Sequence, residues 1–285
     1  MLVFGALVVS QSASAAAVPP DLKVDSTLRQ VRIVAISKLP PNPDGARIDE
    51  YCSDLQPRFD IAPKTLGGRL AAKRGWIVTS ETKLGNYDAV TLIGALDAAT
   101  SGTCGHRDGN LAIFEGSRLR AIAYEPSRTN SDPNDIVASD SIGSAEQIDQ
   151  GRIRLRWGLP GAPIADVVLR KNGIHVEHTA KEDRVCEGAA LVPNIFAQDI
   201  RRARTRLLAY GWRPVRPTEP LNGGTDERLR RSGVTEVEIC SGTGYGYCVF
   251  NYRHAKGPKL VVTSAGDDPH VIDYDVRCGG SNKSM

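Results

Sequence analysis

The six cysteines constrain the fold of this chain most, because its N-terminus resembles a secretory leader. Leu2 to Val9 are almost all apolar, and small residues follow from Ser12 to Ala17. This pattern is typical of a signal peptide, so we expect residues 1–15 to be removed by cleavage after Ala15. The apolar run is shorter than the roughly 20 residues that span a bilayer. We therefore predict a periplasmic or secreted protein that is not membrane-spanning, in which the thiols form disulfides.

The length and charge of the chain favour two modest domains and argue against a polyanionic partner on charge alone. The 285 residues carry a net charge of +3, which gives no reason to expect nucleic acid as a ligand. A chain of this size usually divides into two domains. We expect an N-terminal extension at 16–50, domains at 51–184 and 185–279, and a disordered tail at 280–285.

Two similar segments indicate an ancient duplication. Gly75-Trp76 and Gly211-Trp212 each follow a helical pattern and precede a strand pattern, and the same offset separates Cys104 from Cys240. Glycine suits the position just after a helix, and repeated landmarks point to internal repeats. We predict an α+β fold of two disulfide-braced domains, each a helix or helix pair packed on an antiparallel β-meander. The alternative is that two helix ends look alike by chance.

The second half reads as a helix pair followed by four strands. Phe196, Ile200, Ala203 and Leu207 share one helical face, with Asn194 as the expected cap. A short second helix is expected from Thr225 to Ser232. Alternating runs separated by turn residues then predict the strands Val234 to Cys240, Tyr247 to Arg253, Lys259 to Ser264 and Val271 to Cys278.

The first half shows a longer series of strand patterns and one polar segment. The polar stretch 126–150 is expected to be a long loop, and Asn172-Gly173 marks a hairpin. The predicted strands are Ile77 to Thr82, Ala89 to Leu96, Leu111 to Glu115, Leu119 to Tyr124, Arg152 to Trp157, Asp166 to Arg170 and Ile174 to His178.

Two disulfide patterns remain open at this stage. If each half closes its own loop, the pairs are Cys52–Cys104, Cys186–Cys240 and Cys248–Cys278. The rival joins Cys240 to Cys248 across a Gly-rich turn and Cys186 to Cys278 at the ends of the second domain. We favour the rival, because the first of these bonds closes locally and the second constrains the unfolded domain most.

The motifs that suggest chemistry lack its geometry, so we expect no catalytic residue, cofactor or metal site. The Gly-rich stretch 242–246 leads into a strand, whereas a phosphate-binding loop opens a helix. His175 and His178 would point to opposite faces of a strand. Cys104 lies too close to His106 along a loop for a nucleophile and its base, and an exported thiol is normally bridged.

The helix after Asn194 carries the strongest local charge. Its solvent face bears Arg201, Arg202 and Arg204, among other arginines. One interpretation is an ordinary solvated helix face. The other is a patch that faces an anion, such as an envelope polymer, a lipid headgroup or an acidic protein.

The segment from Ile239 to Tyr252 resembles a Cys-x-Gly-Thr-Gly-x-x-x-Cys-x-Phe module found in exported bacterial proteins that have no known activity. The resemblance covers the C-terminal third and implies export and the domain layout only. Ser241, Gly242, Gly244 and Tyr247 are also similar to the inhibitory loop of bacterial lysozyme inhibitors of the MliC type. Unlike that family, this loop has Gly246 in place of a basic residue and lies between cysteines, and the second motif of the family is absent.

We therefore expect an exported, non-enzymatic binding or protein-interaction module, inhibitor-like in character, whose partner is an unknown envelope macromolecule or protein. Its expected binding residues are Ser241, Tyr245, Tyr247, Arg201, Arg202 and Arg204. The alternative is a cell-envelope hydrolase with a site assembled between the domains from Asp88, His106 or His270. A structural envelope protein without a specific ligand is a third option.

Overall fold

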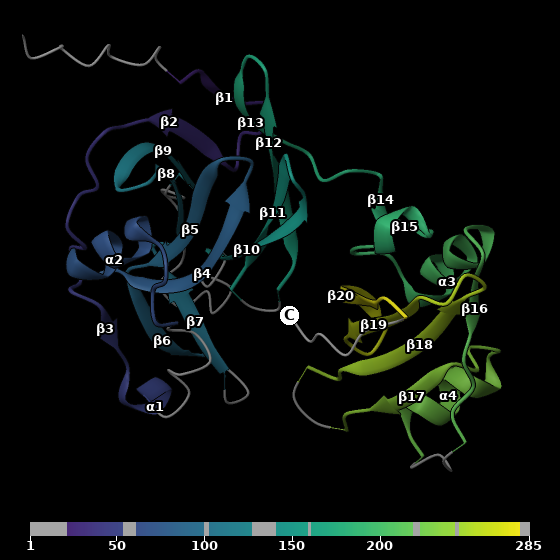
Figure 1. Cartoon of the computed structure of the whole chain (residues 1–285). Coiled ribbons are helices and arrows are strands. Elements are labelled where there is room, and N and C mark those ends of the chain that lie inside the picture. The colour runs from purple at the N-terminus through teal and green to yellow at the C-terminus, as the bar shows by residue number, and fades with distance from the viewer. Residues whose placement is uncertain are drawn as a thin grey trace, which may run out of the picture.

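Antiparallel strands form most of this protein, in two units that follow each other along the chain (Figure 1). The first unit comprises residues 22–178 and the second residues 182–279. The predicted leader 1–15 and the predicted tail 280–285 lie outside the described residues. The computed structural model describes residues 22–53, 61–99, 103–126, 141–158, 161–218, 223–242 and 245–279.

The first unit is a β-sandwich of two five-stranded sheets. One sheet has the order β1 (Val24–Ser26), β13 (Gly173–Glu177), β12 (Pro163–Arg170), β11 (Arg152–Trp157) and β10 (Ile142–Asp149). The other has the order β2 (Arg32–Ala35), β9 (Arg118–Tyr124), β8 (Asn110–Glu115), β5 (Tyr87–Ile93) and β4 (Ile77–Leu84). Apolar residues of both sheets, such as Leu111 and Ile113 from β8 and Ile153 and Leu155 from β11, form one buried core between the layers.

Hydrogen bonds join the two sheets of the sandwich along one side. The backbone nitrogen of Ala145 in β10 donates to Ser80 Oγ in β4 at 2.9 Å. At the end of β4, Gly85 N donates to the carbonyl of Gln150 at 2.6 Å. These bonds hold the edge strands β4 and β10 of the two sheets against each other.

One helix packs on the outer face of the second sheet, and three further strands form a small separate sheet. Helix α2 (Leu66–Lys73) is capped by Thr65, and its Gly67 lies so close to the Phe114 ring that no side chain would fit there. Trp76 and Ala71 belong to the core under this helix. The small sheet comprises β3 (Arg47–Ile48), β6 (Ala95–Ala99) and β7 (Thr103–Arg107), next to α1 (Glu50–Ser53).

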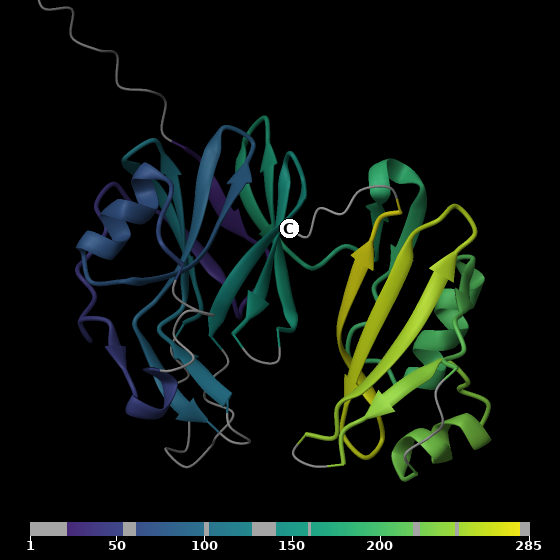
Figure 2. The same ribbon diagram turned by 60° about the horizontal axis from the view of Figure 1, so that its bottom comes forward.

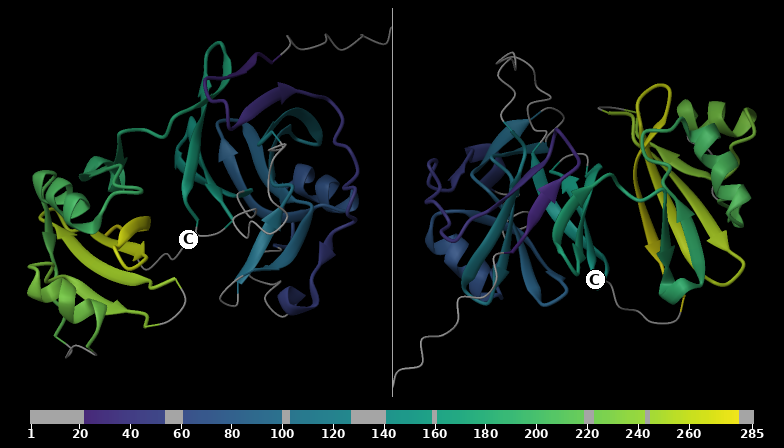
Figure 3. Two further views of the ribbon diagram at one scale, coloured as in Figure 1. Left: turned by 180° about the vertical axis from the view of Figure 1, so that it is seen from behind. Right: turned by 90° about the horizontal axis from the view of Figure 1, so that it is seen from above.

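The second unit is an α+β layer with its helices on one face of the sheet (Figures 2 and 3). Helices α3 (Ile200–Ala209) and α4 (Thr225–Arg231) bury apolar side chains against the sheet. A hairpin of β14 (Glu182–Val185) and β15 (Ala190–Pro193), joined by a 3-10 turn at Cys186–Gly188, precedes them. The sheet contains β16 (Trp212–Pro214), β18 (Cys248–His254), β19 (Lys259–Ala265) and β20 (His270–Arg277), with β17 (Val237–Cys240) also paired to β18.

The two Gly-Trp segments agree locally, but the duplication is not confirmed. Gly75 and Gly211 both end a helix with positive φ, at 80° and 86°, and each indole donates to a carbonyl, Trp76 to Pro40 and Trp212 to Leu191. Beyond these residues the units differ, because the first is a sandwich with one covering helix. The α+β prediction therefore describes the second unit only.

Three further expectations are wrong in detail. Helix α3 begins after Asp199, whose carboxylate accepts from the backbone of Arg201, whereas Asn194 accepts from Phe196 in a preceding turn. The expected extension 16–50 contains strands of both sandwich sheets, too short to show alternation. The expected loop 126–150 contains β10, whose polar residues lie at the solvent side of the sandwich edge.

The disulfides follow the rival pattern that the sequence favoured. The bonds are Cys52–Cys104, Cys186–Cys278 and Cys240–Cys248. Cys186–Cys278 ties the first hairpin of the second unit to the end of its last strand. It therefore closes almost the whole second unit into one covalent loop.

A buried ion cluster joins the two units. Arg154 of β11 is 2% exposed and binds two carboxylates, with Nε 2.8 Å from Asp166 and Nη2 3.1 Å from Asp183 of β14. Arg156 of the same strand binds Asp273 of β20 at 2.8 Å. Charges buried in this way are stable only as pairs, so the cluster fixes the linker hairpin against the first unit.

Candidate functional site

The arginines predicted on α3 are mostly used in internal contacts. Arg204 Nε lies 3.0 Å from Glu236, a fully buried carboxylate that also accepts from Tyr252 at 2.7 Å. Arg201 donates to Ser232 at 3.2 Å. Arg202 is exposed. The helix therefore presents fewer unpaired cations than its sequence suggests, and its role as a binding surface stays a prediction.

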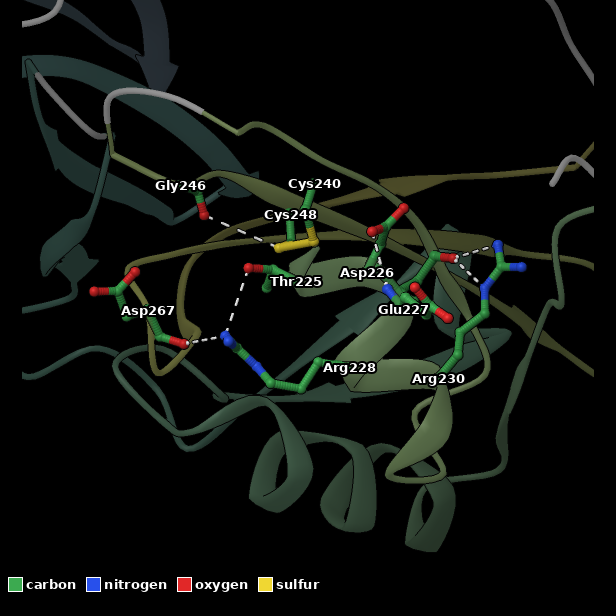
Figure 4. Close-up of a disulfide and its surroundings, with 10 residues drawn as sticks. Thr225, Asp226, Glu227, Arg228, Arg230, Cys240, Gly246, Cys248 and Asp267 are labelled. Atoms are coloured by element: carbon green, nitrogen blue, oxygen red, sulfur yellow. Dashed lines mark hydrogen bonds between the residues drawn. A yellow bond between two sulfur atoms is a disulfide. The ribbon is translucent and has the colours of Figure 1, made fainter. Parts of the chain in front are cut away.

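The predicted binding loop is held by the Cys240–Cys248 disulfide beside α4 (Figure 4). Ser241 N donates to the Tyr247 carbonyl at 2.7 Å. The ring centroids of Tyr245 and Tyr247 lie 5.7 Å apart. Burial raises the pKa of Tyr247, and the charge of Tyr245 raises it further. Tyr245 is 45% exposed. The loop thus offers one aromatic ring to solvent, and its binding role also stays a prediction.

The residues considered for a hydrolase lie in three different sheets. Asp88 of β5 pairs with Lys83, His106 is buried on β7, and His270 begins β20 with Nδ1 2.6 Å from the Asp268 carbonyl. Within the described ranges, no group of three or more His, Cys, Asp or Glu side chains is placed to hold a metal ion. The candidates for the hydrolase are therefore not brought together.

The buried His106 predicts an acid-dependent loss of stability. Burial lowers the pKa of His106 to about 4, whereas an unfolded chain has a histidine pKa of about 6.5. Protons therefore bind the unfolded state first, and stability falls as the pH drops from about 6.5 towards about 4. At about 1.4 kcal/mol per pKa unit, the full loss is about 3 kcal/mol.

Urea unfolding at a series of pH values measures this loss. His106→Leu should flatten the dependence between pH 6.5 and 4, whatever its effect on stability at neutral pH. The exposed His270→Gln is the control and should leave the slope unchanged. An equal slope in the wild type and His106→Leu would show that other groups cause the acid sensitivity.

The sheet of the second unit carries a line of cations that the linear sequence does not reveal. Cross-strand pairing sets Arg213 opposite Arg253, Arg253 opposite Lys259, and Lys259 opposite Arg277. All four are exposed and lie on the face away from α3 and α4, because their strand neighbours Trp212, Tyr252 and Leu260 point into the core. We call these four residues the cationic row: Arg213, Arg253, Lys259 and Arg277.

The cationic row is scarcely neutralised. Arg277 Nε lies 3.6 Å from Asp275, an exposed pair that contributes little. Across the described residues, Arg213, Arg253 and Lys259 form no ion pair or side-chain hydrogen bond. Like charges directly opposite one another destabilise a sheet, so the arrangement weakens this unit in the absence of an anion.

Comparison of the chain with family models, with curated proteins and with solved structures finds no match. As for the membrane, the described helices are all too short or too polar to cross one.

Two hollows lie beside the cationic row and share Arg253 in their linings. One, of about 450 Å³, is lined by Arg213, Arg253, His254, Ala255 and Gly257. The other, of about 240 Å³, has the aliphatic side chains of Val215 and Val261 beside three cations of the row. The first volume lies in the lower part of the range of small-molecule sites and the second lies below that range, so the hollows suit an extended ligand better than an enclosed one.

Sequence reasoning missed the row for a physical reason. Its members come from four strands, and each is a single charged residue in an alternating pattern. Only the strand register places them opposite one another. The one available signal was the pair of charges at the ends of the predicted strands Tyr247 to Arg253 and Lys259 to Ser264, which a short turn joins.

Proposed function

We propose that this protein is an exported, non-enzymatic binding protein whose second unit binds an anionic partner through the cationic row. The observation that carries this proposal is the register that aligns four exposed cations on the helix-free face. Four like charges in a row lower the stability of the free protein. A bound anion would neutralise them, and this accounts for the presence of the row. The hollows beside it supply contact area without a catalytic group.

A pair of charge-matched variants tests the surface. Arg253→Glu with Lys259→Glu reverses the middle of the row, and Arg201→Glu with Arg202→Glu changes the net charge equally on α3. Both proteins are eluted from an immobilised phosphate resin with a salt gradient. The row variant should elute at clearly lower salt than the wild type, and the helix variant close to it.

Two outcomes of this experiment would contradict the proposal. Equal shifts in the elution salt concentration would mean that retention on the resin depends on net charge only. A larger shift for the helix variant would make α3 the anion-binding surface instead. The four substituted residues are exposed, so both variants should keep the fold. Thermal unfolding of each variant checks this.

Export is the second part of the proposal and has its own test. Three disulfides in a chain with an apolar, small-residue start support it. Intact mass of the protein from its native cell envelope, with and without reduction, should show loss of the residues before Ala16 and three disulfides. An unprocessed chain with six free thiols would contradict export.

A further inference from the structure

The length of the cationic row defines the kind of anion that fits it. Neighbouring strands lie about 4.8 Å apart, so four side chains from four strands span about 15 Å. A single phosphate or carboxylate is held by one or two forked arginine contacts and leaves the rest of the row unneutralised. The matching ligand therefore carries several negative charges in a line across the strands.

We propose that this ligand is a linear phosphate polymer, an inference that rests on the proposed function. The backbone of the inner strands supports this choice. β18 and β19 are paired on both sides, so the face offers side chains but no backbone partners. An extended acidic peptide gains affinity mainly by adding to an open sheet edge, whereas a phosphate polymer presents only its anions.

Among the described residues that line the hollows, no exposed Phe, Tyr or Trp ring offers a stacking platform, which separates this ligand from nucleic acid. Single-stranded nucleic acids are bound through bases stacked on exposed aromatic rings. Among the described lining residues, the one Tyr beside the row is Tyr252, which is 1% exposed and bonded to Glu236. His254 packs its ring edge to face with Trp212, at 5.3 Å between centroids. Apart from Asn251, whose amide donates to Glu238 at 2.6 Å, the hollows are otherwise lined by small, aliphatic and cationic residues, which suit an unsubstituted phosphate chain.

Chain-length dependence of binding is the direct test. Calorimetric titration of the full protein with inorganic phosphate, tripolyphosphate and longer polyphosphates should show weak binding of the first two. Affinity should then rise until one chain covers the row. For four contacts, log K should fall with log salt with a slope of about −3, from about −0.7 per contact.

Neutral substitutions in the row assign the contacts. Arg253→Gln and Lys259→Gln should each make the salt slope shallower by about 0.7, while Arg202→Gln, on the other side of the unit, should not change it. Unchanged slopes in both row variants would overturn the inference, because the polymer would then bind elsewhere.

Two competing probes, an acidic peptide and an anionic vesicle, make the remaining outcomes decisive. Octaglutamate that binds as tightly as polyphosphate of matched charge would point to an acidic protein. Phosphatidylglycerol vesicles that bind when polyphosphate does not would point to a membrane surface. Either result overturns the phosphate polymer and leaves the proposed anion-binding function standing. If no probe binds and the resin test also fails, both proposals fail.

Discussion

Arg154→Leu is expected to lower the free energy of unfolding by about 3 kcal/mol, because it removes the closest counter-charge of two buried carboxylates and leaves them only the longer contacts of Arg152, at 3.4 and 3.3 Å. Asp166 and Asp183 are 2% and 5% exposed, and both bind this guanidinium. Urea unfolding followed by tryptophan fluorescence measures the change. Since Asp183 belongs to the second unit, the variant should also unfold in two separate steps.

Two further variants distinguish the effect of a buried ion pair from that of a solvent-exposed ion pair. Arg170→Leu removes an exposed partner of Glu177 and should cost less than about 1 kcal/mol. The triple variant with Asp166→Leu and Asp183→Leu added to Arg154→Leu should regain most of the loss, because apolar side chains can replace a buried ion cluster. A triple variant as unstable as Arg154→Leu would show that the arginine acts through packing alone.

Removal of the Cys186–Cys278 disulfide is expected to have the second large effect. The bond spans 92 residues and Cys240–Cys248 spans 8. Loop-closure entropy then gives losses of about 4.6 and about 2.5 kcal/mol for the two alanine double variants. Thermal and urea unfolding of Cys186→Ala with Cys278→Ala, beside Cys240→Ala with Cys248→Ala, measures the difference.

The ranking of the two bonds is the decisive result. The variant Cys240→Ala with Cys248→Ala is the matched control, since it removes the same number of sulfur atoms from the same unit. A loss at Cys240–Cys248 equal to or above that at Cys186–Cys278 would mean that native packing around the turn, rather than the unfolded chain, sets the effect. In that case the loop-closure argument for this unit would be wrong.

The strands of the second unit were predictable because their side chains alternate between a core and solvent. Phe250 and Tyr252 of β18 are buried while Arg253 is exposed, which is the period-two signal itself. The sandwich was harder to foresee, because β1 and β2 are short and pair with strands far along the chain. Local patterns define such elements poorly.

The ion cluster shows that local sequence patterns are equally poor at revealing the candidate sites. Arg152, Arg154 and Arg156 alternate along β11, so they appear from sequence as one solvent face. Arg154 is nevertheless buried, because Asp183, 29 residues away, folds back over it. Both the cluster and the cationic row depend on contacts between distant segments, which periodicity does not encode.

The alternation on β18 also protects the protein against mispairing. A slip of this strand by one residue would turn Arg253 inward and expose Tyr252, since neighbouring side chains point to opposite faces. Burial of an unpaired guanidinium is prohibitive, and the Cys240–Cys248 bond additionally holds β17 and β18 in one alignment. The charges that attract a ligand thus also exclude the wrong alignment of the sheet, and neutralising them would relax both constraints at once.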